Sequence, residues 1–174
     1  MAVLDIHFAS NTLSRKVSMK AIVPTDPYNA YTGMATEYHE DKLMRSLYLL
    51  HGYGGDCTDW IDNTDIMRLA QEHQLAVFLP SGENSFYVDS TVRGAWEKFF
   101  TDELVPFTRS TFNVSHDIDD TFIAGNSMGG FGALSIGLGH PEVFGKIAAL
   151  SSALILDDID GIGPGYHDPI ADYD

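Results

Sequence analysis

The residues Gly125-Asn126-Ser127-Met128-Gly129 form a G-x-S-x-G pattern, the most specific chemical signal in the sequence. They join an apolar run at 121–124 to a glycine- and alanine-rich segment at 127–138, which we expect to be a strand and a helix. A serine on a sharp strand-to-helix turn needs glycine neighbours, because larger side chains would collide there. The pattern predicts that Ser127 is a nucleophile for acyl carbon. A serine helix cap would explain the hydroxyl but not both glycines.

An acyl-transfer site also needs hydrogen-bond donors for the oxyanion that develops on the substrate. The turn itself supplies the amide N–H of Met128, at the positive end of the expected helix. The glycine-rich run at 51–55, His51-Gly52-Tyr53-Gly54-Gly55, follows another apolar run and could supply a second donor, from Tyr53 or Gly54. The alternative is an ordinary glycine turn. We expect His51 to be a structural loop residue and not the catalytic base.

The serine hydroxyl needs a histidine to take its proton, and a carboxylate to orient that histidine. Two histidines, His140 and His167, follow Ser127 in the chain. His140 lies at the far end of a helix of about 12 residues, roughly 18 Å long, and cannot reach the serine. His167 is therefore the in-chain alternative, with Asp157, Asp158 or Asp160 as the orienting acid. The competing interpretation is a solvated histidine in an acidic tail.

Apolar runs of strand length alternate along the chain with longer segments of helical periodicity. We expect strands at residues 3–8, 16–23, 46–50, 75–79, 121–124 and 146–151, and helices at about 58–71, 95–112 and 127–138. Pro106 predicts a kink or a break in the second helix. The order favours an α/β fold with a doubly wound, mostly parallel sheet and helices on both faces. Residues 1–156 are expected to fold together, with 157–174 an irregular acidic tail or the start of a cap region.

The composition excludes several classes of partner. The chain has 174 residues, 25 acidic and 10 basic side chains, and a net charge of −15. This charge repels phosphate backbones and anionic lipids, so we expect binding neither to nucleic acid nor to membranes. The sequence has no apolar run of spanning length. The single cysteine, Cys57, cannot form an internal disulfide, which is typical of a reducing compartment, so a cytoplasmic location is expected.

Several motifs together resemble the esterase branch of the α/β-hydrolases, up to about residue 156. They are LLHGYGG, Asp59-Trp60, Ser85-Phe86-Tyr87, TFIAGNSMGGFGAL, HPEVF and KIAALSSAL. Within this branch the sequence is most similar to bacterial tributyrin esterases, with S-formylglutathione hydrolase (esterase D) as a relative. The resemblance implies that Ser127 accepts the acyl group and that Tyr53 and Met128 donate to the oxyanion. It also implies an acyl or alcohol pocket near Trp60, Phe86 and Tyr87, with no metal or cofactor.

The sequence departs from the family pattern in one respect. The family places its acid and histidine after two further strands, which this sequence does not contain. We therefore interpret the chain as the N-terminal part of a hydrolase domain, cut after its sixth strand. The acid and histidine would come from residues beyond 174 or from a second polypeptide, and a homo-oligomer is a further option. The alternative is a degraded relative.

The expected function is a serine carboxylesterase that hydrolyses small, short-chain acyl esters. The alternative within the enzyme class is a thioesterase of the S-formylglutathione hydrolase type, because the same groups serve both leaving groups. The alternative from another class is a non-catalytic binding protein, or an inactive fragment, that kept the hydrolase architecture. The feature that supports this non-catalytic alternative is the lack of a histidine base in the family's position.

The assignment of an in-chain base is directly testable. If His167 takes the proton from Ser127, His167→Ala should abolish ester hydrolysis, because the serine then lacks its base. The measurement is the turnover of p-nitrophenyl acetate by the two purified proteins. Unchanged turnover would exclude His167 as the base.

Overall fold

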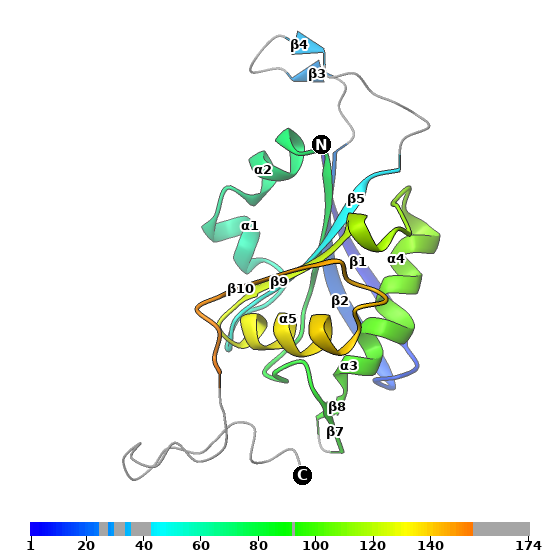
Figure 1. Ribbon diagram of the computed structural model, residues 1–174, viewed down its shortest axis with the longest axis vertical. Helices are drawn as coiled ribbons and strands as arrows, with labels where there is room; N and C mark the ends of the chain where they lie inside the picture. The colour runs from blue at the N-terminus through cyan, green and yellow to red at the C-terminus, as the bar shows by residue number, and fades with distance from the viewer. Residues whose placement is uncertain (25–27, 30–33, 36–42, 92, 155–174) are drawn as a thin grey trace.

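A computed structural model describes residues 1–24, 28–29, 34–35, 43–91 and 93–154. Its centre is a six-stranded sheet (Figure 1). The residues of the acidic tail that were candidates for the base and the acid, His167, Asp157, Asp158 and Asp160, lie outside the described residues. In spatial order the strands are β1 (Ala2–Ser10), β2 (Arg15–Val23), β6 (Leu75–Pro80), β5 (Arg45–Leu50), β9 (Thr121–Asn126) and β10 (Lys146–Leu150).

The sheet is mostly parallel, as the sequence predicts. Strands β6, β5, β9 and β10 run parallel to one another, while β2 is antiparallel to both β1 and β6. Two short antiparallel pairs lie outside this sheet: β3 (Tyr28–Asn29) with β4 (Met34–Ala35), and β7 (Asp89–Ser90) with β8 (Gly94–Ala95). Because β5 and β9 are adjacent and parallel, the loops after their carboxyl ends emerge at the same edge of the sheet.

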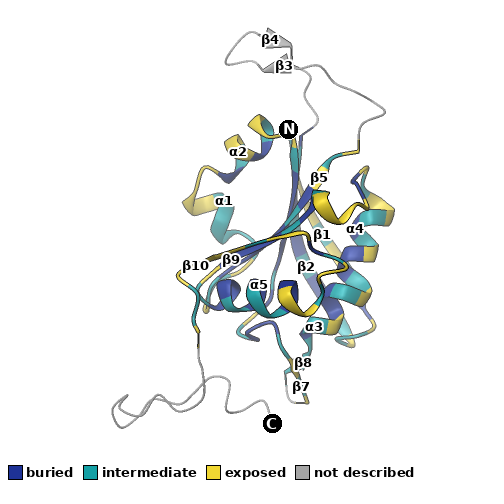
Figure 2. Ribbon diagram, in the orientation of Figure 1, coloured by how far each residue is buried: buried dark blue, intermediate teal, exposed yellow. Residues whose placement is uncertain are grey.

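Helices cover both faces of the sheet, which makes the fold a doubly wound α/β fold (Figures 1 and 2). One face packs against α1 (Asp59–Asn63) and α2 (Ile66–Glu72). The other packs against α3 (Trp96–Lys98), α4 (Val105–Thr111) and α5 (Met128–Gly139). Alternate side chains of β5 enter the two cores, with Tyr48 and Leu50 on the α5 side and Leu49 on the α2 side.

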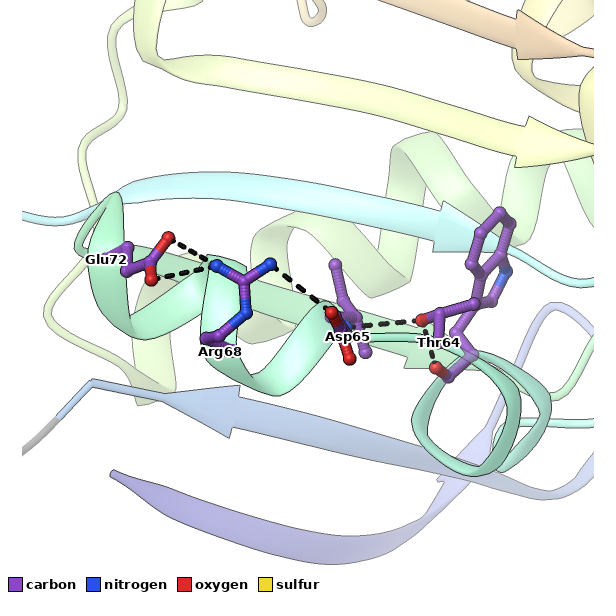
Figure 3. Close-up of polar contacts among 6 residues, drawn as sticks. Thr64, Asp65, Arg68 and Glu72 are labelled. Atoms are coloured by element: carbon purple, nitrogen blue, oxygen red, sulfur yellow. Dashed lines mark hydrogen bonds and ion pairs between the residues drawn. The ribbon is translucent and has the colours of Figure 1, made fainter. Parts of the chain in front are cut away.

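The helix expected at 58–71 is in fact two helices, separated at Thr64 and Asp65. Thr64 has an extended backbone, with φ −143° and ψ 172°. Its hydroxyl donates to the carbonyl of Trp60 and accepts from the amide of Ile66 at 3.2 Å, so it ends α1 and starts α2. On α2, Arg68 forms surface ion pairs with Glu72 and Asp65 (Figure 3). Such exposed pairs add little stability.

The helical segment near Pro106 is continuous but changes its winding. A π-helical stretch, η1 (Phe99–Leu104), lies between α3 and α4, and the amide of Val105 donates to the carbonyl of Phe100 five residues earlier. A proline at the next position has no N–H to continue α-type bonding, and the wider turn accommodates that loss. A short 3₁₀ helix, η2 (Ile118–Asp120), precedes β9.

Glu103, on the π-helical stretch, ties that stretch to the β1–β2 hairpin. Its carboxylate accepts hydrogen bonds from the Ser10 hydroxyl and from the amides of Asn11 and Thr12, at 2.9 and 2.8 Å for the two amides. Partial burial works to raise the pKa of Glu103, but these hydrogen bonds outweigh it and the pKa is lowered. One carboxylate thus connects the π-helical stretch to three consecutive residues of the hairpin turn.

Strand β10 is the edge of the sheet in the described part of the chain. Four of its five residues are exposed, and only Ile147 is half-buried. Parallel strands are usually covered on both faces, so this exposure is unusual and leaves an edge open to pairing. None of the helices that the structure describes combines the length and apolar character needed to cross a bilayer.

Replacing Glu103 tests the role of its charge. Glu103→Gln should destabilise the protein by about 1–2 kcal/mol at pH 7, because the charged acceptor is lost. A lowered folded-state pKa means that this stability is present above the unfolded pKa and is lost as the pH falls through the folded value. The difference between wild type and variant in urea unfolding should therefore shrink below about pH 4. A difference that stays constant from pH 7 to pH 3 would contradict this account.

Candidate active site

Ser127 occupies the turn between β9 and α5 in a strained backbone conformation. Its φ is 55° and its ψ is −116°, a region that non-glycine residues rarely adopt. Hydrogen bonds hold the turn from both sides: the Ser127 amide donates to the carbonyl of Leu150 at 2.9 Å, and its carbonyl accepts from the amides of Phe131 and Ala153, both at 3.0 Å. The segment after β10 therefore helps to fix the serine.

The two glycines of the G-x-S-x-G pattern are required by backbone contacts. A Cβ on Gly125 would lie 2.2 Å from the carbonyl oxygen of Gly129. A Cβ on Gly129 would lie 2.4 Å from the carbonyl oxygen of Leu50 and 2.6 Å from that of His51. Because these neighbours are backbone atoms, they cannot rotate away. Glycine at 125 lets the end of β9 lie against the first turn of α5, and glycine at 129 lets that turn lie against the end of β5.

The glycine loop at 51–55 lies directly beside Ser127. A Cβ on Gly52 would be 3.6 Å from the Cβ of Ser127, so the two turns are in van der Waals range. The Gly54 amide donates to Oδ1 of Asn84 at 2.7 Å. Within the described residues, neither the Tyr53 amide nor the Met128 amide has a hydrogen-bond partner. Of the two candidates left open by the sequence, Tyr53 therefore has the free N–H and Gly54 does not.

His51 is a buried structural residue, in agreement with the sequence analysis. Only 1% of its surface is exposed. Its Nδ1 lies 2.7 Å from the carbonyl oxygen of Gly52, and its Nε2 accepts from the amide of Gly82 at 2.8 Å, which assigns the proton to Nδ1. Burial lowers the pKa of His51. With both ring nitrogens bonded to backbone, His51 has no free nitrogen to act as a base.

Aromatic side chains surround one side of this loop. The rings of Tyr53 and Phe86 are 6.1 Å apart, and those of Phe86 and Phe131 are 6.0 Å apart. Tyr87 is fully buried, and its hydroxyl donates to the carbonyl of His51 at 3.0 Å. Tyr87 thus supports the loop from the core side. Trp60 lies apart from these rings: it packs in the α2-side core and donates its indole N–H to the carbonyl of Leu50 at 3.0 Å.

Two of these neighbours were missed by the sequence reasoning. Phe131 lies one helical turn after Ser127, and the i, i+4 spacing is the signal that could have found it. Asn84 immediately precedes the Ser85-Phe86-Tyr87 motif, but nothing in the sequence pairs it with the glycine loop.

No base accompanies Ser127 in the part of the chain that the structure describes. No side chain there hydrogen-bonds the Ser127 hydroxyl. His140 follows the last residue of α5 and lies 2.9 Å from a carboxylate oxygen of Glu97 and 3.2 Å from one of Glu142. Desolvation works to lower the pKa of His140, but the hydrogen bonds and negative charges of Glu97 and Glu142 together outweigh it and the pKa is raised. The described residues also contain no group of three or more His, Cys, Asp or Glu side chains arranged to hold a metal.

A serine on a strained turn between a parallel strand and a helix, beside a glycine loop that follows the neighbouring strand, defines the α/β-hydrolase fold. The family model "Putative esterase" matches residues 29–158. The chain belongs to this esterase family.

Individual relatives agree with this assignment. The chain is 40% identical to an acetyl esterase from Caldicellulosiruptor saccharolyticus, over 99% of this chain and 64% of that protein. Two solved structures from Staphylococcus aureus are each 30% identical to this chain, and each alignment covers 87% of this chain and 57% of the solved one. They are the fluorophosphonate-binding serine hydrolase FphF, with a TM-score of 0.76, and S-formylglutathione hydrolase (FrmB), with a TM-score of 0.73. The chain thus spans less than two thirds of the length of each of these three proteins.

Substitution of the turn glycines tests the close contact between α5 and β5. Gly129→Ala should destabilise the protein by at least about 3 kcal/mol, because the methyl group would meet two backbone carbonyls. Gly139→Ala is the matched control at the other end of α5, where the nearest atom, in the Glu97 side chain, is 3.4 Å away. The control should be neutral or stabilising by up to about 1 kcal/mol. Equal urea-unfolding free energies for the two variants would contradict the contact.

Proposed function

We propose that the protein is a serine carboxylesterase acting on short acyl esters, with Ser127 as its nucleophile. The observation that carries the proposal is the strained Ser127 turn, which lies beside two unpartnered amides, those of Tyr53 and Met128. Backbone strain of this kind clusters at functional sites, and unpaired amides at a helix N-terminus favour an anion. The acetyl esterase, 40% identical, supports a short acyl group.

The proposed reaction follows from these positions. The Ser127 oxygen attacks the ester carbonyl carbon, and its proton passes to a histidine. The carbonyl oxygen becomes an oxyanion that accepts hydrogen bonds from the amides of Tyr53 and Met128. The tetrahedral intermediate collapses, the C–O bond to the alcohol breaks, and the alcohol leaves with the proton from the histidine. Water then attacks the acyl-serine by the same route and releases the carboxylic acid.

The helix α5 contributes to the oxyanion site through its direction. Ser127 and Met128 lie at its N-terminus, where the unpaired amides and the helix dipole favour negative charge. The 12 residues of α5 give the helix three full turns. The oxyanion would thus form against the positive end of a regular helix, in a position fixed by the sheet.

The histidine and its acid are proposed to lie outside the described residues. They would come from residues beyond 174, from a second polypeptide, or from the tail through His167. Phe86, with 3% of its surface exposed, and the ring of Tyr53 are the proposed contacts for the acyl or alcohol group. Trp60 and Tyr87 would shape the pocket from the two cores behind it.

A thioesterase of the S-formylglutathione hydrolase type is the second candidate. It is favoured by the solved S-formylglutathione hydrolase from S. aureus, which is 30% identical with a TM-score of 0.73. The same nucleophile and oxyanion donors would serve a thiol leaving group. The relative turnover of an acetyl ester and of S-formylglutathione distinguishes the two. A non-catalytic binding protein is the third candidate, and the experiment below separates it from both.

Labelling with a fluorophosphonate tests the nucleophile. The Ser127 oxygen should displace fluoride from phosphorus, and one phosphonyl group per chain should be found by mass spectrometry on the peptide that contains Ser127. Ser127→Ala should lose the label and should lower ester hydrolysis by at least about 10³-fold. Ser135→Ala, on the same helix, is the matched control and should keep both.

A folded sample that takes up no label would contradict the esterase and thioesterase proposals for this chain and favour the binding protein. Labelling of a serine other than Ser127 would contradict the role of Ser127 as the nucleophile but not the proposed activity. The intact mass of the same sample shows whether a further polypeptide is bound.

A further inference from the structure

The loop at 51–55 is held against a second loop, at 82–87, by three hydrogen bonds. Two of them fix His51 at the start of the glycine loop: the Gly82 amide donates to its Nε2 at 2.8 Å, and the Tyr87 hydroxyl donates to its carbonyl at 3.0 Å. The third reaches the tip, where the Gly54 amide donates to Oδ1 of Asn84 at 2.7 Å. The start and the tip of the glycine loop are therefore held by different residues.

Open space surrounds the tip at Gly54. Gly54 has a φ of +80°, and no atom lies within 4 Å of the position of a Cβ there. Tyr53 is 59% exposed, and its ring lies 6.1 Å from that of Phe86. The Gly55 amide closes the turn by donating to the carbonyl of Gly52 at 3.1 Å. A glycine in open space can adopt many backbone conformations, so a hydrogen bond to its amide helps to select one of them at Gly54.

Asn84 itself is firmly placed. Its carbonyl accepts from Nη1 of Arg93 at 2.9 Å. The hydroxyl of the next residue, Ser85, donates to the carbonyl of Gly82 at 2.6 Å and accepts from the amide of Tyr87 at 3.0 Å. Glu83, Phe86 and Tyr87 have φ values of 52°, 54° and 61°. A loop with three non-glycine residues in this region keeps its shape only where its surroundings hold it.

We propose that Asn84 is a positioning residue for the oxyanion site, and this rests on the proposed function. By accepting from the Gly54 amide, Asn84 orients the peptide between Tyr53 and Gly54 and so leaves the preceding amide, that of Tyr53, facing Ser127. In this proposal Asn84 acts through the Gly54 amide and not directly on the substrate. Its effect is on the position of the Tyr53 amide relative to the oxyanion. This position matters most in the transition state, where the oxyanion carries the charge.

Removing the hydrogen-bond acceptor of Asn84 tests the proposal, and the variants are made in the full-length protein. Asn84→Ala should lower kcat for p-nitrophenyl acetate by about 10- to 100-fold with KM within about twofold, since a displaced oxyanion donor acts on the transition state. Asn84→Asp keeps an acceptor and should lose less than the alanine variant. Asn63→Ala is the matched control, because it removes an exposed amide that bonds only locally, to the carbonyl of Asp59 at 2.9 Å. Its kcat should equal that of the wild type.

Amide hydrogen exchange provides a readout that does not depend on activity. The Gly54 amide should exchange at least about tenfold faster in Asn84→Ala than in the wild type or in Asn84→Asp, while amides of β5 stay unchanged. If the alanine variant folds poorly, Asn84→Leu has a similar shape without an acceptor and replaces it. A kcat within twofold of the control, or unchanged Gly54 exchange, would overturn the proposal. A wild type that hydrolyses no ester would overturn the proposed function, and Gly54 exchange would then still report on the hydrogen bond itself.

Discussion

The close contact between the start of α5 and the end of β5 is the constraint on which the rest of the site depends. Gly129 lies against the carbonyls of Leu50 and His51, with no space for a methyl group. Since β5 and β9 are adjacent and parallel, this contact brings the serine turn and the glycine loop to one edge of the sheet. A looser contact would separate the serine from the neighbouring amides by the width of a side chain. Side-chain chemistry at this site is therefore set by backbone packing.

Local strain at this edge is balanced by contacts with the rest of the fold. The positive φ of Ser127 persists because Leu150 and Ala153, on either side of the end of β10, bond to its backbone. A fold with cores on both faces of the sheet can hold such a turn rigidly, since α5 packs along its length against the sheet. Strain of this kind is stored where the surrounding structure determines the conformation. The stability of the core and the geometry of the turn are thus linked.

Much of the fold could be predicted from the sequence, because buried parallel strands are short apolar runs and their order with helices restricts the topology. The break at Thr64 could not, since the apolar spacing continues across it and the helix ends through the extended backbone and hydroxyl hydrogen bonds of one residue. The π-helical stretch was also hidden, because Pro106 indicates a disturbance without saying which hydrogen bonds replace the lost one. At the site, the pattern predicted the serine turn and its glycines. The choice between Tyr53 and Gly54 required the three-dimensional partner of Gly54, which is Asn84, from a distant loop.

The burial of His51 has a consequence for how the protein responds to acidity. Its ring is neutral and bonded at both nitrogens, and burial keeps its pKa low. Burial also raises the pKa of Tyr87 well above its usual value. Burial therefore favours the uncharged form of both ionisable side chains that support the glycine loop. Protonation of His51 would place a hydrogen on Nε2 and break its bond with the Gly82 amide, so the two loops are held together by the uncharged ring.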